Sequence, residues 1–181
     1  MAKKLIGSAA LTTDTSGLAT SVMTTKGDLA TYSTSRVRIG IGNNSDIFVA
    51  DSGEATGNKW TANTTSFVLA CSDEETALTT GTKLTFRMPF AYTVTAVRAS
   101  LTTAGTGANL VTVDINESGT TILSTEITID ATETTSTTAS TAPVIDDPDL
   151  ADEAKITIDV DVTGTDATGL KVYIIGYRVA H

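Results

Sequence analysis

The sequence has little of the chemistry on which most catalytic and metal sites depend. Cys71 is the only cysteine among the 181 residues, which excludes an intrachain disulfide and a cysteine metal cluster. It ends the apolar run that starts at Ser66, with no histidine or lysine close by, so we predict a buried and unreactive thiol. His181 is the only histidine, and Gly-x-Ser-x-Gly and phosphate-loop motifs are absent. We therefore expect no enzyme.

Basic residues and long apolar runs are also scarce. The chain has 12 lysines and arginines but 21 aspartates and glutamates, so its formal charge is −9, which argues against a nucleic-acid partner. The one basic cluster, Lys3-Lys4, precedes an apolar run too short to span a membrane. That run, Leu5-Ile6-Gly7, gives way at once to polar residues, unlike a secretory signal. We expect neither export nor membrane anchoring.

Carboxylates are plentiful, and two groups of them are candidates for a cation site. Asp159 and Asp161 fall on one face of a predicted strand, about 7 Å apart. Five more crowd one segment: Asp146, Asp147, Asp149, Asp152 and Glu153. Such groups can bind Ca²⁺, but the sequence has no Asp-x-Asp-x-Asp-Gly loop, and acids on an outer strand face are usual in water. We predict no metal and no cofactor.

Threonine makes up roughly a fifth of the chain, far above ordinary usage. Its β-branched side chain favours strands. Residues 1–62 carry isolated apolar residues with only brief alternation, and such a segment cannot bury enough surface alone to offset the entropy of ordering it. We predict an all-β chain: an extended N-terminal arm over residues 1–62, followed by an antiparallel, jelly-roll-like β-sandwich over residues 63–181.

Alternating runs separated by turn residues predict about eight strands in the sandwich. The clearest runs are residues 84–90, 92–101, 111–115, 120–124, 126–130, 156–162 and 170–179. Asn116 to Gly119 predicts a hairpin turn, and Pro89 marks a strand end, an edge or a bulge.

Between these runs, residues 131–142 predict a surface loop and residues 151–153 one helical turn. The run 170–179 is apolar on both faces, as in a central strand. Tyr173 and Tyr177 share one face of it, which we interpret as core or interface.

One stretch of the arm resembles a known module. Thr24-Thr25-Lys26-Gly27-Asp28-Leu29 is followed by Arg38, Gly40 and Gly42, then by Ala50-Asp51-Ser52 and by Ala55-Thr56-Gly57-Asn58-Lys59-Trp60. This ordered set resembles a module of bacteriophage virion proteins, especially tail fibres and head-associated fibres or decorations. The module usually has Gly-Gln-Val-Leu before Ala-Asp-Ser, whereas this chain has Asp46-Ile47-Phe48-Val49 and lacks the glycine.

The resemblance implies an intertwined homotrimer, because family members typically form one. Three copies around an axis can bury isolated apolar residues that one copy leaves exposed. We predict these interface residues: Leu29, Val37, Ile39, Ile41, Phe48, Val49 and Trp60. The alternative is that these side chains pack on the chain's own sandwich.

Two functions fit the resemblance. The first is a structural virion protein, a capsid decoration (cement) or head fibre that contacts the major capsid protein or other virion proteins. The second is a tail-fibre or adhesin subunit that binds a host surface glycan. The chain's short length favours the first, because tail fibres usually carry a long shaft. In both, the protein is made in the host cytoplasm and resides in the virion, on the capsid surface or the tail.

Overall fold

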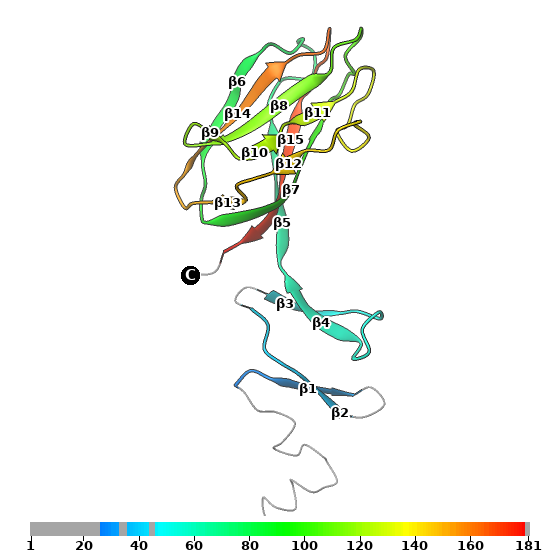
Figure 1. Ribbon diagram of the computed structural model, residues 1–181, viewed down its shortest axis with the longest axis vertical. Coiled ribbons are helices and arrows are strands. Elements are labelled where there is room, and N and C mark those ends of the chain that lie inside the picture. Colours follow the sequence, from blue (N-terminus) through cyan, green and yellow to red (C-terminus); the bar gives the residue numbers. More distant parts are fainter. Residues whose placement is uncertain (1–25, 33–35, 44–45, 180–181) are drawn as a thin grey trace, which may run out of the picture. The chain divides into compact units, whose positions relative to one another are not determined.

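The computed structural model describes residues 26–32, 36–43 and 46–179, and within these ranges every regular element is a β-strand (Figure 1). The all-β prediction is confirmed. The chain divides into two compact units, residues 1–63 and 64–181. In the ranges described, no helix is long and apolar enough to cross a bilayer.

Two antiparallel hairpins make up the described part of the N-terminal unit. The strands are β1 (Leu29–Tyr32), β2 (Arg36–Ile39), β3 (Asp46–Ala50) and β4 (Asn58–Ala62). β1 pairs with β2, and β3 pairs with β4. Lys3, Lys4 and the first twenty residues, which the sequence singles out as a basic cluster and arm, lie outside the described residues.

Two antiparallel sheets, one of four strands and one of five, make up most of the C-terminal unit. One has the order β13-β7-β15-β5 and the other β11-β8-β14-β6. Their strands are β5 (Thr64–Ala70), β6 (Gly81–Arg87), β7 (Tyr92–Ser100), β8 (Val111–Glu117), β11 (Ile127–Ile129), β13 (Asp149–Leu150), β14 (Lys155–Val162) and β15 (Lys171–Arg178). The short strand β9 (Thr120–Thr121) pairs with β8 as the fifth strand of the second sheet. β10 (Leu123–Thr125) and β12 (Val144–Ile145) pair with each other in a separate two-stranded sheet.

The chain crosses from one sheet to the other between β5 and β6, again between β6 and β7, and again between β7 and β8. The last strand, β15, then inserts between β5 and β7. This strand order is that of a jelly roll, so the predicted architecture is confirmed. β15 is a central strand, as its run of apolar residues predicts.

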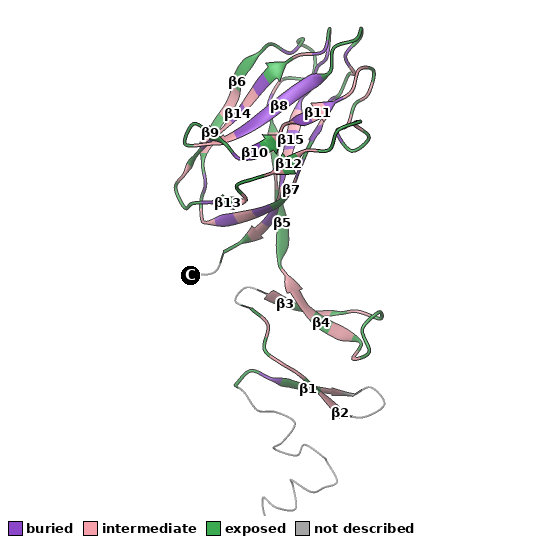
Figure 2. Ribbon diagram, in the orientation of Figure 1, coloured by how far each residue is buried: buried purple, intermediate pink, exposed green. Residues whose placement is uncertain are grey.

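The core fills the space between the two sheets, because each strand turns alternate residues inward. Along β14, Ile156, Ile158 and Val160 are fully buried, whereas the residues between them are not. Buried residues of β8, in the same sheet, and of β15, in the other sheet, belong to the same core (Figure 2). Cys71 belongs to this core, and its burial raises the pKa of the thiol to about 11, which agrees with an unreactive cysteine.

The structure corrects two local predictions. The hairpin after β8 forms, but its returning strand β9 has only two residues, and Leu123–Thr125 leaves to pair with β12 as β10. Residues 151–153 form no helical turn. The Ala154 amide donates to the Ala151 carbonyl in a tight turn, and Glu153 has a φ of 59°, which a helix does not allow.

Candidate functional site

The β1–β2 hairpin brings three of the predicted interface residues onto one face. Leu29 lies opposite Ile39, and Thr31 lies opposite Val37, two positions further along. Side chains of paired residues in an antiparallel ladder point to the same side. Leu29, Val37 and Ile39 therefore form one small apolar face, in which Leu29 is 38% exposed.

The β3–β4 hairpin pairs two more of them. Phe48 lies opposite Trp60, and their rings are 5.0 Å apart between centroids, inclined by 53°. Val49 lies opposite Lys59 and hence on the other face of this hairpin. The structure thus brings Phe48 and Trp60 together and separates Val49 from them.

Close packing against glycine fixes Trp60 and Ile41. The Trp60 indole nitrogen donates a 2.8 Å hydrogen bond to the Gly40 carbonyl. A Cβ atom added at Gly42 would be 2.7 Å from the Trp60 ring, and one added at Gly27 would be 2.7 Å from the Ile41 side chain. The glycines therefore allow the close approach of two side chains.

Ion pairs hold each hairpin internally. The Asp28 carboxylate, whose side chain is wholly buried, accepts a 2.6 Å bond from Arg38. In the β3–β4 loop, Asp51 accepts from Lys59 at 2.6 Å and from the Gly53 amide at 2.8 Å. The hydrogen bond from Lys59 is the main reason that the pKa of Asp51 lies below its ordinary value. The polar residues that carry the resemblance thus organise the hairpins.

No large apolar side chain in the described part of the N-terminal unit is fully buried. Leu29, Ile41, Ile47 and Phe48 are 38%, 61%, 41% and 42% exposed, and no residue of β3 or β4 is buried (Figure 2). Val37, Ile39, Val49 and Trp60 are half-buried. The predicted interface residues do not include Ile47. The sequence could have pointed to it, because the run Asp46–Ala50 has apolar residues on both faces.

The sandwich carries a carboxylate cluster that the sequence predicts only in part, because it contains Asp161 of the candidate pair Asp159 and Asp161 but not Asp159. Oxygens of Asp114 (β8), Glu126 and Asp161 (β14) all lie within 4.8 Å of one another. Burial raises the pKa of Glu126, as do the charges of Asp161 and Asp114 and a hydrogen bond with Asp161. The sequence could not predict the whole cluster, because the cluster forms only when β8 pairs with β14, which is far from it in the sequence.

Three carboxylates at this spacing can share a cation or a proton. Asp114 already accepts bonds from the Ile115 amide at 2.8 Å and from Asn116 and Thr121 at 3.0 and 2.5 Å. The raised pKa of Glu126 favours the protonated form of its carboxyl. We assign no metal to the cluster, and the absence of a metal stays a prediction.

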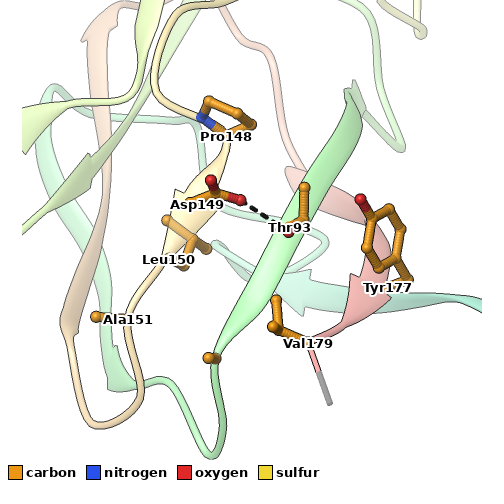
Figure 3. Close-up of a pocket in the computed structure, with 8 residues that line it drawn as sticks. Thr93, Pro148, Asp149, Leu150, Ala151, Tyr177 and Val179 are labelled. Atoms are coloured by element: carbon orange, nitrogen blue, oxygen red, sulfur yellow. Dashed lines mark hydrogen bonds between the residues drawn. The ribbon is translucent and has the colours of Figure 1, made fainter. Parts of the chain in front are cut away.

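A groove of about 660 Å³ crosses the outer face of the β13-β7-β15-β5 sheet at one end. In Figure 3, Thr93 of β7 lies between Asp149 of β13 and Tyr177 of β15, and its hydroxyl donates to the Asp149 carboxylate at 2.7 Å. Tyr173 and Tyr177 point outward, because the alternate positions Val172 and Ile174 fill the core. The interpretation of these tyrosines as core is wrong, and their role as an interface stays a prediction.

Comparisons with protein families, with curated proteins and with solved structures found no match to this chain. His181, the one residue that a histidine-based mechanism would need, lies outside the described residues.

Proposed function

We propose that this chain is a structural protein of a bacteriophage particle, a capsid decoration or head fibre that assembles as a homotrimer through its N-terminal hairpins. The jelly-roll sandwich then faces outward from the particle, and the chain has no catalytic role. Its partners are copies of itself and the major capsid protein or another virion protein.

The observation that carries this proposal is the exposure of large apolar side chains on the two hairpins. Phe48 of β3 is 42% exposed, and Ile41, in the segment that joins the two hairpins, is 61% exposed, in a unit whose described sheets have two strands each. An isolated two-stranded hairpin is marginally stable in water. Gathered apolar surface on a small unit marks a contact with another molecule, and a second and third copy supply the missing cover.

Two further features support it. The residues that resemble the virion module include both ion pairs of the hairpins, Asp28–Arg38 and Asp51–Lys59, so the resemblance falls on residues with a structural task. Jelly rolls are also common in viral capsid proteins, although a fold by itself does not establish a function.

Light scattering of the purified full-length chain tests the assembly. We expect a mass near three times 18.7 kDa. Substitution Ile41→Asp places a charge between the two hairpins, on the most exposed large apolar side chain of the described N-terminal unit, and should lower the mass toward one copy. The control is Val144→Asp, at a side chain 49% exposed on the sandwich, which should keep the wild-type mass. A monomeric wild-type chain would contradict the proposal.

Antibody labelling of intact particles, directed at the sandwich, tests the location. Label on the head supports a decoration or head fibre. Label on the tail would favour the alternative, a tail-fibre subunit that binds a host glycan.

A further inference from the structure

The outer face of the β13-β7-β15-β5 sheet has few acidic side chains for a surface of this acidic chain. Strand pairing aligns its outward side chains in four rows across β5, β15 and β7: Thr64–Tyr177–Thr93, Ser66–Ile175–Ala96, Val68–Tyr173–Arg98 and Ala70–Lys171–Ser100. Val68 is 59% exposed, whereas Tyr173, Ile175 and Tyr177 are half-buried. Tyrosine and arginine are the residues that dominate the energy of protein interfaces.

No residue of these four rows is an acid. At the rim, Asp149 bonds Thr93, and Glu74 pairs with Lys171 at 2.6 Å. Arg98 is exposed and forms no ion pair with any residue that the structure describes. The rows therefore present one unpaired cation on a chain whose formal charge is −9.

The other sheet has the opposite character. Its outward positions include Thr112, Asp114 and Asn116 on β8 and Thr157, Asp159 and Asp161 on β14. Asp114, Asp161 and nearby Glu126 form the carboxylate cluster described above. The outward positions of β8 and β14 are thus polar and acidic, although Thr112 and Asp114 are themselves buried, whereas the other face combines aromatic, aliphatic and cationic side chains.

The β5 edge of the β13-β7-β15-β5 sheet is also unpaired among the described strands. β5 pairs with β15 on one side, and no described strand pairs with its other side. Edge strands are usually protected by charges, proline or a bulge. The sequence Thr64–Ala70 has no charge and no proline, and its pairing with β15 shows no register shift.

We propose that this face, from β5 to Arg98, is a second contact between copies of the chain, within the C-terminal unit and separate from the hairpin contact. The inference rests on the proposed function for its choice of occupant. It adds a contact surface on the sandwich to the contact that the proposed function places on the N-terminal hairpins.

A second copy is the occupant that the chain favours. β4 ends at Ala62 and β5 begins at Thr64, so one residue separates the proposed hairpin contact from the strand that carries Val68. Copies joined at β4 bring their β5 strands to a high local concentration. Because every copy carries a formal charge of −9, two copies repel each other least where their surfaces lack carboxylates, as this face does.

Cysteine cross-linking of the full-length chain tests this contact. Val68→Cys places a thiol on the proposed face, and Thr85→Cys places one on exposed β6, facing outward from the other sheet. The native Cys71 is buried and its thiol pKa is raised to about 11, so a bis-maleimide should react with the introduced thiols alone. The unsubstituted chain is the control for that reactivity.

We expect Val68→Cys to give a covalent pair of chains with a yield on the order of tenfold above Thr85→Cys, because the contact raises the local concentration of the thiols. Adding Arg98→Glu to Val68→Cys should reduce that yield, since it places a carboxylate on the face. Equal yields from the two positions would overturn the inference. Cross-linking of Val68→Cys in particles to a different virion protein, and not to itself, would also overturn it.

Failure of this inference and failure of the proposed function are distinguishable. A trimeric mass without cross-linking at Val68→Cys rejects the sheet contact and leaves the hairpin assembly standing. A monomeric mass with preferential cross-linking at Val68→Cys in concentrated solution rejects the hairpin trimer and retains the sheet contact.

Discussion

Individual carboxylates in this chain lie in two contrasting electrostatic settings. Asp51 accepts hydrogen bonds from Lys59 and the Gly53 amide, which favour its charged form and lower its pKa. Glu126 is partly removed from water and faces Asp161 and Asp114, which disfavour its charged form and raise its pKa. The same residue class therefore supports the fold at one position and opposes it at another.

The raised pKa of Glu126 predicts a pH-dependent effect of Glu126→Gln. A carboxyl whose pKa is higher in the folded than in the unfolded chain stabilises fully below the unfolded pKa, and this stability is lost as the pH rises through the folded pKa. Glutamine cannot ionise. The free energy of unfolding of Glu126→Gln, relative to wild type, should therefore increase as the pH rises from about 4 to 7, by less than about 1 kcal/mol because the site is largely solvated.

Urea denaturation at several pH values measures this difference. Glu75→Gln removes an exposed carboxyl outside the cluster and serves as the control. A difference between Glu126→Gln and wild type that does not change with pH would show that Asp161 and Asp114 exert no repulsion on Glu126.

At the scale of one element, β14 shows how alternation sets the energetics of the sandwich. Ile156, Ile158 and Val160 point into the core and are fully buried, while Val162 at the strand's end is 41% exposed. β14 also lies between β8 and β6, so that its inward residues contact the middle of the core. The strand's contribution to stability is therefore concentrated on one face.

Ile158→Ala should lower the free energy of unfolding by about 3 kcal/mol, because it removes buried methyl groups and leaves a cavity. Val162→Ala, on the same strand, should change it by less than about 0.5 kcal/mol. Chemical denaturation followed by circular dichroism compares the two. Similar losses for both variants would mean that the end of β14 is covered by something other than this sandwich.

At the scale of the whole molecule, the two units differ in how they are stabilised. The buried hydrophobic core runs from Cys71 to Ile174 and draws no residue from the N-terminal hairpins. The hairpins are held by ion pairs and by contacts with glycine, and none of their apolar strand residues is fully buried. The sandwich should fold alone, and the hairpins should depend on partners.

Residues 64–181 expressed without the N-terminal unit should therefore form a soluble β-domain that unfolds in one cooperative transition. The shortened chain should fail to join the particle, because the proposed assembly residues are gone. Circular dichroism on denaturation and composition of particles from complemented infections measure these two outcomes. Retained incorporation would contradict the assembly role of the hairpins.

The sequence by itself determined the all-β class and most strands of the sandwich. Period-two alternation at Ile156–Val162 and the apolar run ending in β15 are local signals, and burial of one strand face requires them. It also singled out Phe48 and Trp60, whose rings the structure brings together, while their role in an interface stays a prediction. Whether Val49 joins them depends on alternation within β3, and the structure places it on the opposite face.

Only the tertiary structure decided which distant strands became neighbours. The pairing of β8 with β14 created the cluster of Asp114, Glu126 and Asp161. The insertion of β15 between β5 and β7 placed Tyr173 between Val68 and Arg98, on a surface and not in the core. Local alternation shows that a strand has two faces. Which face meets the core, and which side chains of other strands lie beside it, follows from pairing across more than a hundred residues of chain.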